Sequence, residues 1–168
     1  WGYINTKGEQ AIECKFDDAR DFKEGFARVQ KDGKWGYINT KGEQIIECKF
    51  DDAGNFSEGF AAVEKDGKWG YINTKGEQIV ECKFDDTHRF NEGFAAVKKD
   101  DRWGYINTKG EQIVKCKFDG VGDFNEGFAA VKKDRKWGYI NTKGYPAFFD
   151  KSKNEIEVVD KVIDRSNN

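Results

Sequence analysis

The chain has 168 residues, a length that fits one domain or one repeat array. Its 29 Lys and Arg residues nearly balance 31 Asp and Glu residues, so no net positive field favours nucleic acid or an anionic membrane. No apolar stretch approaches the roughly 18 residues that a membrane-spanning helix needs. Aromatic residues make up 15% of the chain, which argues against disorder and predicts a core of Trp, Tyr and Phe.

A repeat of 34 residues dominates the sequence. The octet Trp-Gly-Tyr-Ile-Asn-Thr-Lys-Gly recurs unchanged, beginning at Trp1, Trp35, Trp69, Trp103 and Trp137. The fifth copy keeps only this octet before the pattern breaks at Tyr145-Pro146. We therefore divide the chain into a repeat array over residues 1–144 and a C-terminal cap over residues 145–168.

Each repeat predicts three β-strands, because apolar residues alternate with a period of two rather than 3.6. In the second repeat the strands cover residues 35–38, 44–50 and 60–65. Segment 51–59 crosses to the next meander, and we expect Phe56 in this segment to be buried in the core. Gly59 is expected to leave the crossing in a left-handed conformation.

Two turns join these strands into a meander. Residues 39–42, Asn-Thr-Lys-Gly, fit a type I turn followed by a left-handed glycine. Asp66-Gly67 fits a two-residue hairpin turn, in which both residues take positive φ. Counting outward from this turn sets Val63 opposite Gly70, and a side chain that covers bare backbone offers a reason for the glycine.

The same hairpin turn loses its glycine in the later repeats. There we assign it to Asp101-Arg102 and to Asp134-Arg135. Because a non-glycine residue is disfavoured at positive φ, we expect these turns to be strained or wider than two residues.

A meander of this size cannot bury a core alone, whereas stacked neighbours can. We therefore expect an all-β array of three-stranded meanders stacked as an open solenoid or superhelix. A propeller-like ring is the alternative, although its blades usually carry four strands in about 40–50 residues.

The cap allows two interpretations. Residues 145–150 extend the strand pattern, with Pro146 tolerated at an edge. Residues 152–155 resemble a helix capping box, after which Ile156, Val159 and Ile163 would share a helical face. The run Glu-Ile-Glu-Val-Val is equally typical of a strand, so the secondary structure here stays open.

The octets, followed by EQII and then FDDAGNFSEGFAAVEKDGK, resemble the bacterial WG-repeat family from Trp1 to about Gly144. The resemblance implies a β-rich scaffold that binds or displays rather than catalyses, and it supplies no catalytic residues. One departure is local: cysteine stands where family members commonly have proline, at Cys14, Cys48, Cys82 and Cys116.

The four cysteines are interpreted as small core residues. Stacked sheets lie about 10 Å apart, too far for a disulfide. Zinc sites need paired ligands, and each cysteine here is solitary. Unpaired thiols slightly favour a cytoplasmic location, with the cell surface as the alternative. Since the chain has no Met and no signal segment, we expect a fragment or a processed form.

The sequence shows no distinct site for enzymatic chemistry. His88 is the only histidine and lies in a crossing segment, where a solvated loop residue is expected. The carboxylate pairs recur almost unchanged, so they lack the asymmetry that a glycosidase pair needs. Residues 123–127 only faintly resemble a calcium loop, without its later glutamate. We predict no catalytic residues, no cofactor and no metal.

The aromatic rows are the remaining candidates. We expect Trp35 and its equivalents to be core residues, because tryptophan is highly buried on average. The tyrosines two positions later could instead form a ladder that stacks on a ligand, since a phenol favours one wet end. Turn lysines would rim that groove, which gives the candidate ligand-binding residues Tyr37, Tyr71, Tyr105, Lys41, Lys75 and Lys109.

These observations favour a non-catalytic scaffold or spacer that binds a protein through several weak sites. Glycan recognition at a cell surface, through the tyrosine ladder, is the alternative. We expect no nucleic-acid partner and no membrane span, and an enzyme would require a further domain.

Overall fold

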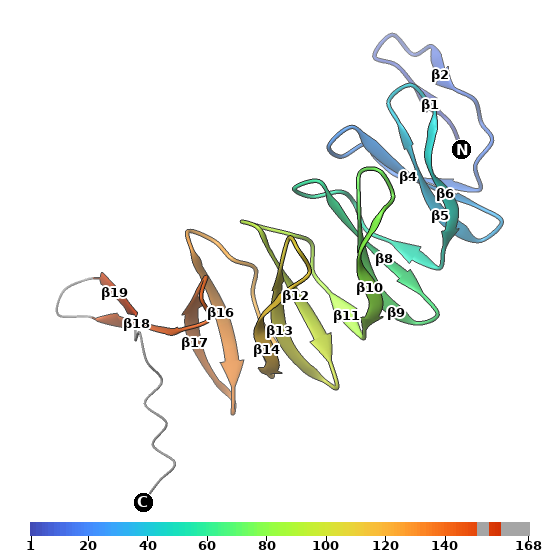
Figure 1. Cartoon of the computed structure of the whole chain (residues 1–168). Coiled ribbons are helices and arrows are strands. Elements are labelled where there is room, and N and C mark those ends of the chain that lie inside the picture. Colours follow the sequence, from blue (N-terminus) through green and yellow to red (C-terminus); the bar gives the residue numbers. More distant parts are fainter. Residues whose placement is uncertain (151–154, 159–168) are drawn as a thin grey trace, which may run out of the picture. The chain divides into compact units, whose positions relative to one another are not determined.

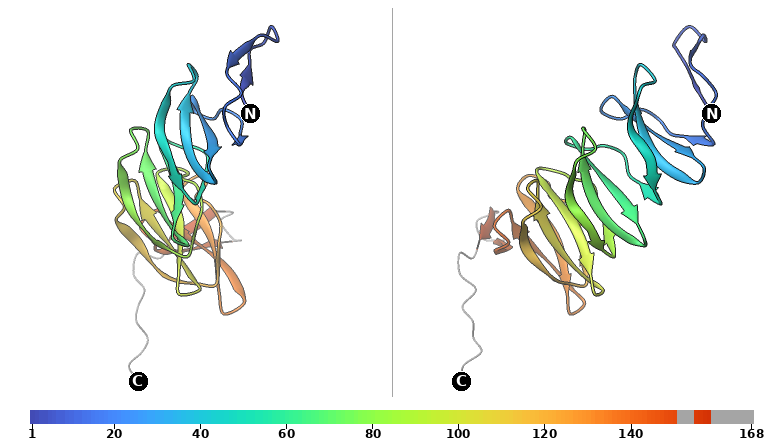
Figure 2. Two further views of the ribbon diagram at one scale, coloured as in Figure 1. Left: turned by 90° about the vertical axis from the view of Figure 1, so that its right-hand side faces the viewer. Right: turned by 45° about the vertical axis from the view of Figure 1, so that its right-hand side comes forward.

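The computed structural model describes residues 1–150 and 155–158, and the regular elements among them are all β-strands (Figure 1). The chain divides into two compact units, Trp1–Phe90 and Asn91–Asn168, which we describe separately. Within both units the chain forms small twisted sheets (Figure 2), in which the last long strand of one repeat pairs with the Trp-Gly strand of the next. No helix in the described part is long and apolar enough to cross a membrane.

The first unit holds a short hairpin and two four-stranded antiparallel sheets. The hairpin pairs β1 (Tyr3–Ile4) with β2 (Gln10–Ile12). The first sheet has the order β3 (Asp18–Ala19), β4 (Phe26–Lys31), β5 (Lys34–Asn39) and β6 (Gln44–Phe50). The second sheet has the order β7 (Asp52–Ala53), β8 (Phe60–Lys65), β9 (Lys68–Asn73) and β10 (Gln78–Phe84), after which β11 (Asp86–Thr87) follows.

The second unit repeats this plan. One sheet contains, in order, β12 (Phe94–Lys99), β13 (Arg102–Asn107) and β14 (Gln112–Phe118). The other contains β15 (Gly120–Val121), β16 (Phe128–Lys133), β17 (Lys136–Asn141), β18 (Pro146–Asp150) and β19 (Glu155–Val158). The chain is thus an all-β repeat array, as the sequence predicts, and whether it is open or ring-like stays a prediction.

The predicted meander is confirmed, with one addition. Val63 pairs with Gly70 and Ala61 with Ile72, the register expected from the two-residue turn. The expected three strands gain a fourth, because residues 52–53 of the crossing segment pair with β8. A strand of two residues is too short to show a period of two, so the sequence pattern gives no sign of it.

The hairpin turn has two residues in every repeat. Asp66 and Gly67 have φ of 53° and 74°, as predicted. In the next repeat the turn residues are Asp100 and Asp101, with φ of 50° and 60°, so our assignment to Asp101-Arg102 was one residue too late. The later turns are therefore not wider, and non-glycine residues occupy left-handed backbone positions.

This strain predicts two stabilising substitutions. Replacing Asp101 or Arg135 (φ 66°) with glycine is expected to raise the free energy of unfolding by about 1 kcal/mol each, because glycine adopts this conformation without a Cβ clash. Urea denaturation followed by circular dichroism measures the change. The reverse substitution Gly67→Ala is the control and should cost a similar amount; equal stability of all variants would contradict the argument.

The glycine of the Trp-Gly pair faces a β-bulge. Trp35 pairs with Phe50 and Tyr37 with Ile46, so four residues of β6 span two of β5. A Cβ on Gly36 would lie 2.5 Å from the carbonyl oxygen of Ile46, a distance that real Cβ atoms essentially never show. Close backbone approach across the bulge therefore requires the glycine, rather than cover by the opposite side chain.

Successive sheets within a unit share one core. Phe56 of the crossing segment is 3% exposed, as predicted, and its ring lies 4.9 Å from that of Tyr37 and 4.6 Å from that of Phe26. The same cluster reaches Val63 and Ile72 of the second sheet. In the second unit Phe124 occupies the corresponding place against Tyr105. Each repeat thus buries its apolar face against its neighbour in the unit.

The tryptophans differ in burial along the chain. Trp35 is 8% exposed and belongs to the core, as predicted. Trp69 and Trp103 are half-buried. Trp1 and Trp137 are 66% and 62% exposed, so the core prediction is wrong for these two. Trp1 precedes strand β1, and Trp137 lies in β17 of the last sheet.

The cap continues the sheet rather than forming a helix over residues 155–158. Strand β18 pairs with β17, where Pro146 lies opposite Ile140. Strand β19 pairs with β18, with Ile156 opposite Phe149. The strand interpretation of Glu-Ile-Glu-Val is therefore correct. The rest of the proposed capping box, together with Val159 and Ile163, lies outside the described residues.

Candidate functional site

The three candidate tyrosines are core residues. Tyr37, Tyr71 and Tyr105 are 0%, 0% and 1% exposed. Their hydroxyl groups donate to carbonyl oxygens of the crossing segment at 2.7 Å, on Gly54, His88 and Gly122 respectively. The expectation of exposed rings is therefore wrong, because the wet end of each phenol is replaced by a backbone acceptor. Tyr37, Tyr71 and Tyr105 therefore expose no ring face on which a glycan could stack.

Burial also sets the acidity of these phenols. It raises the pKa of Tyr37 and of Tyr105 far above the ordinary value, since a buried phenolate would lose its hydration. Both side chains are neutral hydrogen-bond donors throughout the physiological range. They have the environment of structural tyrosines.

The candidate lysines lie just after the carboxyl end of each Trp-Gly strand. Lys41, Lys75 and Lys109 are exposed in the turns between paired strands. Each turn is organised by the preceding asparagine: the side-chain oxygen of Asn39 accepts from the amide nitrogens of Lys41 and Glu43, both at 3.0 Å. The structure does not bring these lysines to a cavity with the tyrosines.

The cysteines are partly buried rather than fully so. Cys48, Cys82 and Cys116 are of intermediate exposure, while Cys14 is exposed. Burial raises the pKa of the first three thiols, which disfavours the reactive thiolate. Cys48 packs against a cluster that includes Ile12, Val29 and Ile38, and its thiol donates weakly to the carbonyl oxygen of Val29. Within residues 1–150 and 155–158, no three His, Cys, Asp or Glu side chains form a metal-binding group.

The repeated carboxylates hold backbone turns. Asp51 accepts a hydrogen bond from the amide of Asp66 at 2.7 Å and also pairs with Lys34, whose hydrogen bond lowers the pKa of the carboxyl group. Glu24 accepts from the amides of residues 58 and 59, at 2.8 and 3.0 Å, and so ties one repeat to the next. These acids have structural partners.

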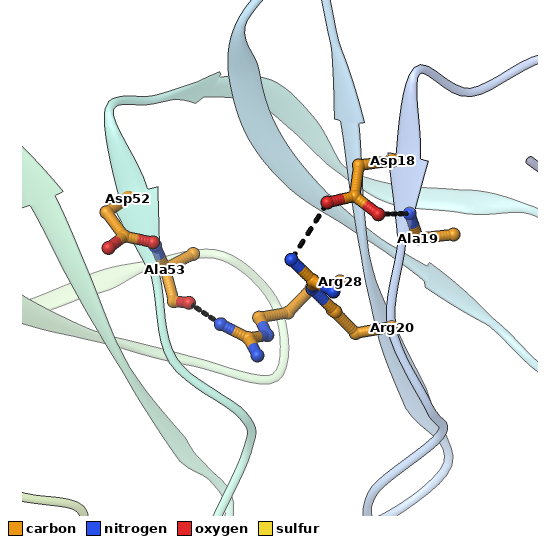
Figure 3. Close-up of polar contacts among 6 residues, drawn as sticks. All are labelled: Asp18, Ala19, Arg20, Arg28, Asp52 and Ala53. Carbon is orange, nitrogen blue, oxygen red and sulfur yellow. Dashed lines mark hydrogen bonds and ion pairs between the residues drawn. The ribbon is translucent and has the colours of Figure 1, made fainter.

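Two arginine side chains lie over the ring of Trp35. The guanidinium of Arg20 lies 5.7 Å from the Trp35 ring centroid and that of Arg28 lies 5.6 Å from it. Arg20 also pairs with Asp18 at 2.9 Å, and Arg28 donates to the carbonyl oxygen of Ala53 (Figure 3). Cation–π attraction and these acceptors together hold both side chains over the indole.

The equivalent place one repeat later is a cleft. Gly54 and Ala62 replace the two arginines, and the face of Trp69 is left open to a cavity of about 370 Å³. No cationic group lies over the Trp69 ring among the described residues. The cavity is lined by Lys23, Gly54, Asn55, Phe56, Ser57, Ala62, Trp69, Thr87, His88 and Arg89.

Comparison with sequence families decides the identity of the array. The model of the WG-containing repeat family matches residues 1–35, 35–69, 69–103 and 103–137. The chain belongs to the WG-containing repeat family. No curated protein matches it. The family match places the bulge glycine and the covered tryptophan in the motif that gives the WG repeat its name.

The lining of the cleft differs from one WG repeat to the next, although the repeats are otherwise nearly identical. Every lining residue except Phe56 and Trp69 stands at a position that varies between the four units. Position 54, for example, is Arg20, His88 or Gly122 in the other repeats. This concentration of differences is visible in the sequence, but only the fold shows that the positions surround one cavity.

A second cavity lies in the other unit. It measures about 420 Å³ and is bordered by Trp137, Tyr139, Pro146 and several lysines. Tyr139 is 51% exposed, in contrast to its buried equivalents.

Proposed function

We propose that this WG-repeat array is a non-catalytic scaffold that binds protein partners through several weak sites. The observation that carries the proposal is the contrast between constant strands and the variable side chains around the tryptophans. The strands, turns and bulge recur with almost no change, while the residues around each tryptophan face differ. A repeated fold that presents different side chains in each repeat suits recognition of an extended polypeptide.

Several weak contacts give useful avidity when they act together. A cleft of about 370 Å³ accommodates one or two side chains, not a whole folded partner. Its mixture of an indole face, an amide, hydroxyls and cationic side chains matches a peptide better than an apolar small molecule. The proposed partner is therefore a protein segment that contacts more than one repeat.

Selection from a phage-displayed peptide library tests this function. An enriched peptide is immobilised on a surface at low and at high density, and binding of the intact chain is measured. We expect the apparent affinity to rise by at least about tenfold at high density, because several repeats then engage at once. The control is a chain that lacks residues 35–68, one complete repeat, with its fold verified by circular dichroism.

Absence of any enriched peptide would refute a peptide-binding role. An affinity that is independent of surface density, or unchanged in the shortened chain, would refute the multivalent part alone. The two results separate recognition from avidity.

A further inference from the structure

The tryptophans of the second and third repeats, Trp35 and Trp69, have the same backbone surroundings, a frame that two arginine side chains fill at Trp35 and that is open at Trp69. The amide of Arg20 donates to the carbonyl oxygen of Arg28 at 3.0 Å, and the amide of Gly54 donates to that of Ala62 at 2.7 Å. A Cβ on Gly54 would lie 3.6 Å from the Ala62 Cβ, an ordinary contact. The two missing side chains would thus begin side by side at the edge of the Trp69 cleft.

The frame around Trp35, which Arg20 and Arg28 fill, indicates which chemical group such a site accepts. Over Trp35 both occupants are guanidinium groups, planar cations that stack on an indole and donate in a fixed fork. The acceptors are a carboxylate, Asp18, and a backbone carbonyl, that of Ala53 (Figure 3). The open frame keeps both acceptor types, because Asp52 and the backbone of Thr87 stand at the corresponding positions.

The open frame also holds a polar atom without a partner. The hydroxyl oxygen of Thr87 is buried and has no hydrogen-bond partner within the described residues. The two preceding repeats have alanine at this position, Ala19 and Ala53. A buried hydroxyl is costly unless it is hydrogen-bonded, and a donor that enters the cleft would satisfy it.

The rim of the cleft favours a negatively charged group, whereas the floor favours a hydrogen-bond donor. Lys23 and Arg89 are exposed cationic side chains among its lining residues. They disfavour a bare cation and favour an acidic group beside it. A ligand that fits both the floor and the rim carries a guanidinium next to a carboxylate.

We propose that the Trp69 cleft binds an arginine side chain of a protein partner, with an acidic residue next to that arginine. The guanidinium stacks on Trp69 and donates to the Thr87 carbonyl oxygen, as Arg28 donates to that of Ala53, and it also donates to the Thr87 hydroxyl oxygen. The neighbouring carboxylate pairs with Lys23 or Arg89. This assignment rests on the proposed protein-binding function and names the side chain that one of its sites recognises.

Titration with a defined peptide tests the assignment. Acetyl-Gly-Arg-Asp-Gly-amide is added to the full chain while the indole N–H resonances are followed by NMR, with Trp69→Phe to assign the relevant signal. We expect the Trp69 resonance to shift to saturation. A citrulline peptide, which keeps the shape and loses the charge, should bind roughly tenfold more weakly. A peptide with Asn in place of Asp tests the rim.

Three variants of the chain serve as matched controls. Ala62→Arg restores the internal occupant, so it should abolish the peptide-induced shift of Trp69, whereas Ala62→Gln, which places no cation over the ring, should weaken the shift less. The double change Arg20→Gly and Arg28→Ala empties the Trp35 frame, and the Trp35 resonance should then respond to the peptide as well. Thermal unfolding checks that each variant folds.

Equal binding of the arginine and citrulline peptides, or an undiminished Trp69 shift in Ala62→Arg, would overturn the arginine assignment. The scaffold function would still hold if peptides from the library bound at other sites. If none of the tested peptides shifts the Trp69 resonance, the arginine assignment is also overturned, while the library selection remains a separate test of the scaffold function.

Discussion

Replacing Gly104 with alanine is expected to lower the free energy of unfolding by about 3 kcal/mol, because the bulge leaves no room for a Cβ. The added carbon would lie 2.8 Å from the amide nitrogen of Cys116 and closer still to the carbonyl oxygen of Val114. Both atoms belong to the backbone of β14, which cannot rotate away as a flexible side chain does. Relieving this clash therefore requires breaking the backbone pairing between β13 and β14.

The last sheet provides a matched control. Gly138 holds the same place in the Trp-Gly motif, but no atom of the residues that the structure describes lies within 4 Å of the position that its Cβ would take. Gly138→Ala should change the stability by less than about 0.5 kcal/mol or raise it slightly, since alanine loses less backbone entropy than glycine on folding. Urea unfolding of the two variants side by side measures the difference. Similar stabilities would contradict the close-approach explanation of the motif.

Features of the fold that depend on residues close together in the sequence are predicted well. A two-residue turn such as Asp66-Gly67 fixes both the twist and the register of its strands, so the pairing of Val63 with Gly70 follows by counting. Alternation then assigns Phe50 and Ile46 to the core side, and both are buried. The crossing segment offers one large apolar residue, Phe56, which has to be the anchor.

Features that depend on contacts between distant residues are not predictable in this way. The bulge opposite Gly36 requires the partner strand to carry extra residues, and a single strand shows no sign of them. The tyrosines illustrate the same limit: alternation places Tyr37 on a face, but not the backbone carbonyl of Gly54 that satisfies its hydroxyl. Without that acceptor, exposure and burial are equally compatible with the sequence.

The candidate site was missed for a related reason. Arg20 lies in a crossing segment, Arg28 in a strand, and Trp35 begins the next repeat. Their meeting over one indole depends on how the crossing segment packs beside β4. Comparison of the repeats does show the substitutions at positions 54 and 62, and that difference between otherwise equal units was the available signal.

Removing a buried tyrosine should unfold the array rather than abolish a binding surface. Tyr105→Ala is expected to lower the free energy of unfolding by about 4 kcal/mol, because it deletes a fully buried ring that packs 5.0 Å from Phe124. Tyr105→Phe keeps the ring but leaves the carbonyl oxygen of Gly122 without its donor, and should cost about 1–2 kcal/mol. Circular dichroism and chemical denaturation measure both changes.

Tyr139 is the control for this comparison, since it stands at the same motif position in the same unit but is 51% exposed. Tyr139→Ala should cost less than about 1 kcal/mol, because most of the ring remains in water when the protein is folded. A Tyr105→Ala variant that keeps the stability of the parent chain would show that the phenol row is not the core, and would restore the ladder as a candidate surface. A large loss of stability in Tyr105→Ala together with a small loss in Tyr139→Ala assigns the buried tyrosines to packing between neighbouring repeats.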